Sequence, residues 1–264
     1  RKVENRKAWY AEWDDNYIYD ILNTNFARNL LRKLADSYYG IQVDEIIDCA
    51  TELVSTAYPM SFEVFRLCCE TLGMYNPPKV YVTGKLKGIN ALSLEVHLKQ
   101  YILISPSSTV RLTPYEQAFL YGHELGHHQQ GNLICHTVNG LLNSLNKRND
   151  LFGYVIPDMI EIPFKRWCRM SEFNADRAGY LCCQDTDSIN SLFLKAIPNK
   201  KCSNVDAYKE LSYGHPLLSA RIRELNNYIK MLGNYQKISL SSQNTIFRVI
   251  EETLSEVVPE RVKA

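Results

Sequence analysis

Two histidines four residues apart, with a glutamate directly after the first, lie in the segment HELGH at residues 123–127. On a helix, residues at this spacing project from the same face, so His123 and His127 can bind one metal ion. A catalytic zinc site has three protein ligands, nitrogen or carboxylate oxygen among them, and a fourth position for water. The motif alone also occurs by chance. It predicts a zinc hydrolase if another part of the chain supplies the third ligand, with Glu124 beside the ion.

Glu172 is the best candidate for the third ligand, on a second helical segment. Asp176 follows one turn later on the same face, where it can accept the free N–H of a ligating histidine and fix its tautomer. Small residues nearby would let this helix approach the first closely: Ala175, Ala178 and Gly179. A structural zinc site is a weaker interpretation, because such sites usually have four protein ligands and rely on cysteine.

His215 and Arg221 form a third element, in the segment GHPLLSARI at residues 214–222. His215 would lie at a helix N-terminus and Arg221 about a turn and a half later, so both could face an anionic reaction intermediate. The alternative is a histidine that caps the helix and an arginine exposed to solvent.

The HELGH helix has a clear start. Thr113 can cap it, Pro114 suits the first helical position, and Glu116 completes a capping box. We expect this helix to end near Gln130, before Gly131.

The remaining elements follow from hydrophobic spacing, which predicts an α+β fold that is mainly helical. The N-terminal part has helical spacing, and the middle has period-two segments that indicate a small sheet of about three strands. The expected elements are two or three helices within 16–72, strands at 80–82, 91–96 and 101–104, and helices at 164–183 and 216–233.

The chain divides into three regions that we expect to form one compact unit. Residues 1–76 are an N-terminal helical region, 77–235 carry the catalytic residues, and 236–264 are a C-terminal extension. The extension contains an amphipathic stretch at 246–257, which could cover a cleft as a latency device, as could the N-terminal helices.

The charge balance argues against nucleic acid as a partner. Lys and Arg total 30 against 29 for Asp and Glu, so no basic field favours a phosphate backbone. No stretch approaches the roughly 20 apolar residues that span a bilayer, so we expect no membrane span. The eight cysteines lack a zinc-ribbon or redox spacing, which favours core thiols and a soluble, cytoplasmic protein, although disulfides stay an alternative. Because the first residue is Arg1, an upstream segment or regulatory partner is compatible with the sequence.

The three motifs, in this order and spacing, resemble the zinc metallopeptidase family that includes the CAAX prenyl endopeptidases, the HtpX-type proteases and the soluble minigluzincins. The resemblance covers about 77–232. It implies a zincin-like fold of the gluzincin type that binds one Zn²⁺ ion. It also implies roles for seven residues: His123, His127 and Glu172 as zinc ligands, Glu124 as catalytic base, Asp176 behind the ligands, and His215 with Arg221 as transition-state stabilisers.

Asn90 and Ala91 are similar to the short NA motif of that family, at a strand that borders the substrate cleft. The glycines that usually follow are replaced here by LSLE at residues 92–95, so the resemblance does not extend to the cleft shape or the substrate preference of the family. Membrane members carry transmembrane hairpins that this chain lacks, so the resemblance implies a minimal relative and does not extend to prenylated substrates.

The mechanism hypothesis is peptide hydrolysis by a metal-activated water, in which Glu124 takes the water's proton and passes it to the leaving amine. The substrate would be a protein or peptide that adds an extended strand to the sheet edge near Asn90 and Ala91. Two alternatives remain. One is a zinc-containing regulatory or partner-binding protein with little or latent activity, and the other is an interaction module with a fold-stabilising metal.

Overall fold

A computed structural model describes residues 24–130, 133, 158–196 and 216–235 of the 264-residue chain. It is a mainly helical α+β structure with one small mixed sheet, as the sequence predicts. The elements, in chain order, are α2 (Asn25–Asp48), β1 (Thr51–Glu52), α3 (Pro59–Leu72), β2 (Lys79–Val82), β3 (Ala91–Val96), β4 (Lys99–Ile104), α4 (Pro106–Val110), α5 (Pro114–Gln129), α7 (Asp158–Cys183), α8 (Thr186–Ala196) and α10 (Leu218–Tyr235).

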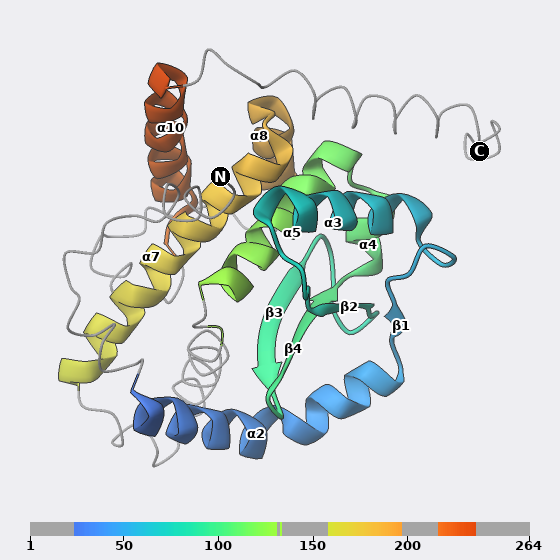
Figure 1. Cartoon of the computed structure of the whole chain (residues 1–264), viewed down its shortest axis with the longest axis vertical. Helices are drawn as coiled ribbons and strands as arrows, with labels where there is room; N and C mark the ends of the chain where they lie inside the picture. Colours follow the sequence, from blue (N-terminus) through green and yellow to red (C-terminus); the bar gives the residue numbers. More distant parts are fainter. Residues whose placement is uncertain (1–23, 131–132, 134–157, 197–215, 236–264) are drawn as a thin grey trace.

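The sheet has four strands in the order β1-β2-β4-β3, so β3 is an edge strand (Figure 1). β2 and β4 are parallel, whereas β3 and β4 form an antiparallel hairpin in which Ala91 is opposite Ile104. The hairpin turns at His97 and Leu98, which have φ angles of 53° and 58°. Two consecutive left-handed residues are what a two-residue hairpin turn with the twist of the flanking strands requires.

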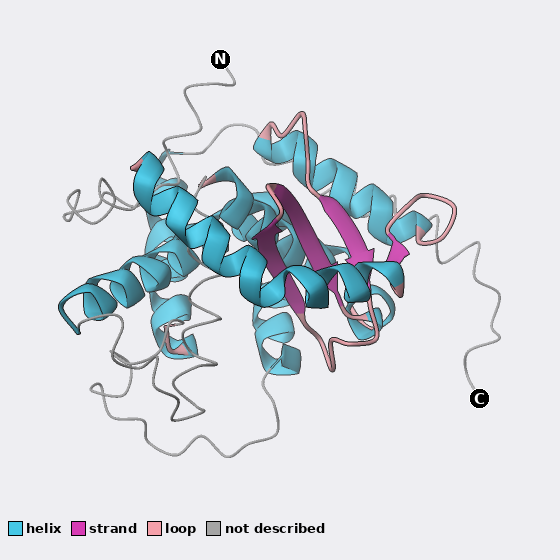
Figure 2. Cartoon of the chain, turned by 90° about the horizontal axis from the view of Figure 1, so that it is seen from below, coloured by secondary structure: helices cyan, strands magenta, loops and turns pink. Residues whose placement is uncertain are grey.

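Helices lie on both sides of the sheet (Figure 2). On one face, β2 and β4 side chains such as Ile102 and Ile104 join the main hydrophobic core together with α3, α5 and α7. On the other face, Leu94 and Val96 of β3 pack with Val43 of α2. Alternate residues of the strands therefore enter two different cores, which is the period-two pattern that the sequence shows.

The start of α5 confirms the predicted capping box. The Thr113 hydroxyl accepts from the Glu116 N–H at 3.3 Å, and a Glu116 carboxylate oxygen accepts from the Thr113 N–H at 2.9 Å. The Glu116 carboxylate also binds Ser191 and Lys195 of α8, at 2.7 and 2.6 Å from Oε1. This contact anchors the first turn of the HELGH helix to its neighbour.

Several elements differ from the sequence expectation. Helices were expected within 16–72, but α2 ends at Asp48, and Thr51 and Glu52 pair with Val82 and Tyr81 of β2. Strand pairing with a distant segment thus overrides a local helical pattern. α7 begins at Asp158, before the predicted residue 164, and the sequence reading contained neither α4 nor α8.

The C-terminal amphipathic stretch at 246–257 lies outside the described residues, so the three-region division stays a prediction. Within the part of the chain that the structure describes, every helix is too short or too polar to cross a bilayer. The described cysteines are free thiols, and burial raises the pKa of Cys69 and Cys183 to about 12. A thiol with so high a pKa is unreactive at neutral pH, which suits a packing role.

Candidate metal centre

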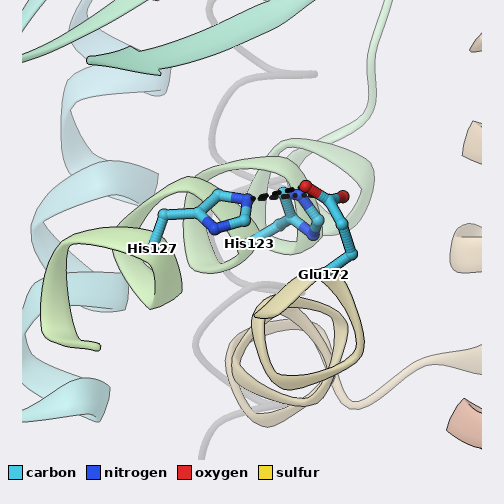
Figure 3. Close-up of side chains that lie close together, drawn as sticks. All are labelled: His123, His127 and Glu172. Atoms are coloured by element: carbon cyan, nitrogen blue, oxygen red, sulfur yellow. Dashed lines mark hydrogen bonds and ion pairs between the residues drawn. The ribbon is translucent and has the colours of Figure 1, made fainter. Parts of the chain in front are cut away.

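Three buried side chains from two helices meet at one point. His123 and His127 come from α5 and Glu172 from α7, and Figure 3 shows all three pointing toward one another. The two Nε2 atoms are 3.2 Å apart. Oε2 of Glu172 lies 3.5 Å from Nε2 of His123, and Oε1 lies 3.4 Å from Nε2 of His127. Among the described residues, this is the group whose donor atoms could hold a metal ion.

These separations fit one tetrahedral metal ion. Two ligand atoms that each lie about 2.1 Å from such an ion are about 3.4 Å apart. The separation of the two imidazole nitrogens, 3.2 Å, and the distances of 3.5 and 3.4 Å from each of them to one of the two Glu172 oxygens are all close to that value. The donor set of two imidazoles and one carboxylate leaves a fourth position for water or substrate. The residues that the sequence singled out as ligands therefore suit a metal ion by type and by spacing.

Asp176 binds the His123 ring on the side away from Glu172 and His127, through Nδ1. Its Oδ1 lies 3.0 Å from Nδ1 of His123, so the Nδ1–H is donated to the carboxylate and Nε2 is left to face the ligand group. Burial disfavours the charged form of Asp176, but the adjacent Arg221 and the hydrogen bonds from Arg221 and His123 hold its pKa below its ordinary value. Asp176 thus remains an anion in an almost fully buried place.

Arg221 reaches the same carboxylate from α10. Its Nε donates to Oδ2 of Asp176 at 2.8 Å and its Nη2 to Oδ1 at 2.5 Å, a bidentate pair. The guanidinium also lies 3.9 Å from Oε2 of Glu172 and stacks over the ring of Phe193 at 5.3 Å. Arg221 is therefore a half-buried side chain that pairs with Asp176, and not an arginine that contacts only solvent.

His215 lies outside the described residues. The structure consequently leaves the proposed pairing of His215 with Arg221 at an anionic intermediate as a prediction.

Glu124 lies beside the ligands and faces the sheet. Its carboxylate Oε2 accepts a hydrogen bond of 2.5 Å from the Ser93 hydroxyl, which also lies 3.3 Å from the Glu124 carbonyl oxygen. Burial raises the pKa of Glu124, while His123 and Ser93 act in the opposite direction. Sequence reasoning missed Ser93. The available signal was the strand alternation, which places it two residues after Ala91 on the same face.

Asn90 and Ala91, the predicted substrate-binding residues, lie at the start of the edge strand β3. The backbone of Asn90 is tied to the start of α4: its N–H donates to Oγ of Ser108, within α4, at 3.0 Å, and its carbonyl accepts from the N–H of Ser105, the N-cap of α4, at 3.0 Å. Next along the strand, Leu92 is 47% exposed, whereas Ser93 is buried. The strand edge is therefore rigidly held at the end where a peptide was expected to bind.

Glycines allow α5 and α7 to pack closely enough to bring the ligands together. A methyl group at Gly122 would lie 2.9 Å from Cα of Gly179, and one at Gly126 would lie 3.0 Å from Cα of Ala175. The first of these distances is shorter than real side chains show, and the second is tighter than most of their contacts. The small residues that the sequence marked on the second helix, Ala175, Ala178 and Gly179, all occur in this contact.

Comparison with known proteins gives one match. A family model described as peptidase family M48 matches residues 63–229, from within α3 to within α10. Comparisons with curated proteins and with solved structures give no match.

Proposed function

The chain belongs to peptidase family M48, a family of zinc metallopeptidases, and on that premise we propose that it is a zinc-dependent endopeptidase that cleaves protein or peptide substrates. The observation that carries this proposal is the buried cluster of two imidazoles and one carboxylate, with a second carboxylate, Glu124, beside it. Metal ligands and a proton carrier in one site are the two components that hydrolysis by activated water requires.

His123, His127 and Glu172 would hold the ion. When bound, zinc supplies Lewis-acid polarisation of the peptide carbonyl and lowers the pKa of water toward neutrality. The proposal of zinc rests on the donor set, since imidazole nitrogen with one carboxylate oxygen and an open position is typical of catalytic zinc.

Glu124 would act as general base and then as general acid. It accepts a proton from the attacking water and donates it to the leaving amine, so no covalent intermediate with the protein forms. Its burial supports this role, because a carboxylate whose pKa is raised by its surroundings both takes and returns a proton more readily near neutral pH. Asp176 and Arg221 would keep His123 in the ligating tautomer.

The substrate would bind in an extended conformation along β3. No other strand of the described chain pairs with its outer edge, and β3 passes directly over Glu124 through Ser93. Main-chain hydrogen bonds to an edge strand fix the register of a peptide while leaving its side chains free, which suits a protease that acts on unfolded segments. His215, with Arg221, would stabilise the oxyanion of the transition state.

The test is hydrolysis of unfolded casein by the purified chain with and without a zinc chelator. We expect activity that the chelator abolishes and that added zinc restores. Glu124→Gln should retain zinc and lose nearly all turnover, because the amide cannot accept the proton. The matched control is Glu116→Gln, another buried glutamate of α5, which contacts α8 and not the ligands. That control should keep its turnover and lose only some stability.

Full turnover in Glu124→Gln would refute the mechanism. Zinc binding without any chelator-sensitive cleavage would instead favour the regulatory or partner-binding protein, in which the site holds a metal but does not turn over substrate.

A further inference from the structure

Ser93 is a buried hydroxyl at the centre of the edge strand, and its neighbours explain where it points. Leu94 and Val96 enter the core between the sheet and α2, so Ser93, one residue earlier, faces the opposite side, toward α5. There its Oγ lies 2.5 Å from Oε2 of Glu124, and it is only 5% exposed.

We propose that Ser93 is a positioning residue for the general base, and that it assigns different tasks to the two oxygens of Glu124. Oε2 is occupied by the Ser93 hydroxyl. Oε1 is left as the oxygen that takes the proton from the attacking water. This inference rests on the proposed function, because Glu124 needs a defined orientation only if it carries a proton.

The physical argument concerns the last bond of the glutamate side chain. The torsion that turns a carboxylate about this bond is broad and nearly two-fold, so steric preference alone does not fix its plane. A hydroxyl donating to a carboxylate makes a short, charge-assisted hydrogen bond, and burial strengthens it. Among the described residues, Ser93 is the side chain that makes such a bond to Glu124.

The geometry also connects the base to the strand on which the substrate would bind. The same hydroxyl lies 3.3 Å from the carbonyl oxygen of Glu124, so Ser93 contacts both ends of that residue. Ser93 of β3 therefore helps to fix the orientation of the Glu124 side chain, in addition to α5, which carries it. A misoriented general base costs turnover and not binding, because the proton transfer takes place in the transition state.

The test compares Ser93→Ala with Ser61→Ala in the zinc-loaded enzyme. Ser61 is a matched control because it is also buried and also donates to a side chain of α5, Gln117, at 2.7 Å. We expect Ser93→Ala to lower kcat by about ten- to a hundredfold, the effect of losing one hydrogen bond to a charged group. KM should stay within about twofold, as for an interaction made in the transition state. Ser61→Ala should leave kcat unchanged.

Two readouts separate positioning from structural damage. Zinc content, measured by elemental analysis, should equal that of the wild type in Ser93→Ala. The second readout is the affinity for a peptidyl hydroxamate, a zinc-binding inhibitor whose proton Glu124 would accept, measured by calorimetry. This affinity should fall about tenfold in Ser93→Ala. In a Glu124→Gln background, adding Ser93→Ala should not lower it further. Ser93→Cys keeps the bulk of the side chain but donates only weakly. It is the second variant, to be used if Ser93→Ala folds poorly, and its kcat should fall as expected for Ser93→Ala.

Unchanged kcat in Ser93→Ala, in an enzyme whose wild type cleaves casein, would overturn this inference and leave the proposed function standing. An equal weakening of the hydroxamate in the presence and absence of Glu124 would also overturn it, because Ser93 would then act by another route. A wild type without zinc-dependent cleavage would overturn the proposed function, and this inference with it.

Discussion

At the scale of single residues, a chain of hydrogen-bonded polar groups ends at His123, a proposed metal ligand. Arg221 binds Asp176 through two hydrogen bonds, and Asp176 binds Nδ1 of His123. Removing one member of a buried charged pair leaves the other uncompensated, which costs more than the pair contributes when intact. Each of these residues therefore matters for the site, although His123 is the only one of the three that we propose as a metal ligand.

Asp176→Asn should weaken zinc binding by about ten- to a hundredfold, the usual effect of losing a carboxylate behind a ligating histidine. The amide no longer holds the Nδ1–H of His123 as firmly, and Arg221 loses its anionic partner. Competition with a chromophoric zinc chelator at constant pH measures the change in Kd. Asp187→Asn, an exposed acidic residue on the neighbouring helix α8, is the control and should bind zinc as the wild type does. Equal affinity in both variants would show that Asp176 does not support the ligand.

At the scale of elements, the separation between α5 and α7 decides whether the ligands can meet. His123 and His127 are set by the period of one helix, but Glu172 reaches them only because the two backbones are nearly in contact. Glycine at the points of closest approach makes this packing possible. Each glycine also makes the helix less stable than alanine would, by about 1 kcal/mol.

Gly122→Ala should destabilise the protein by about 1–3 kcal/mol, as overpacking of a tight core does. The added methyl would lie 2.9 Å from Cα of Gly179, a backbone atom that cannot move aside cheaply, so the strain outweighs the gain in helix propensity. Urea unfolding of the metal-free protein measures the change without interference from the ion. Gly84→Ala places its methyl in open space and is the control. A Gly122→Ala variant as stable as the control would mean that α5 and α7 separate without cost.

Local patterns predicted most of these elements, and non-local contacts account for what they missed. The capping box at Thr113 and the spacing of His123 and His127 are properties of one helix, so the sequence suffices for them. Thr51 became a strand residue because it pairs with Val82. The contacts of Arg221 with Asp176 and of Ser93 with Glu124 depend on which element packs on which. Residue spacing places a side chain such as Ser93 on one face of its own element, but it does not say which other element that face meets.

At the scale of the whole molecule, the sheet separates the metal site from a second helical layer. The region matched by the family, 63–229, contains β2 to α8 in full, whereas α2 and β1 precede it. α2 is nevertheless fastened to the edge strand: Arg32 pairs with Glu95 at 2.7 Å, and the Asp36 carboxylate accepts from the His97 N–H at 2.7 Å. The N-terminal helix is thus part of the support of the strand on which we expect the substrate to bind.

Metal removal should lower the melting temperature of the protein without unfolding it. The main core is built from side chains of α3, α5, α7 and the sheet, and His123, His127 and Glu172 are not among them, so the helices should persist without the ion. An ion that binds only the folded state adds about 4 kcal/mol when its concentration is 1,000 times its Kd. Calorimetry with increasing zinc, together with far-UV circular dichroism after chelation, measures both effects. Loss of the helical signal on chelation at room temperature would favour the fold-stabilising metal of an interaction module.

The register of the β3–β4 hairpin has a consequence for how this chain can vary in length. Side chains alternate between the two faces of a strand, so deleting or inserting one residue within β3 would exchange its faces. Ser93 would turn from Glu124 into the apolar layer against α2, and Leu94 or Leu92 would take its place above the base. Changes of two residues would restore the faces but shift the strand along α5. We therefore expect natural length variation to be confined to the segments around β3, and the six residues of the strand itself to be invariant in number.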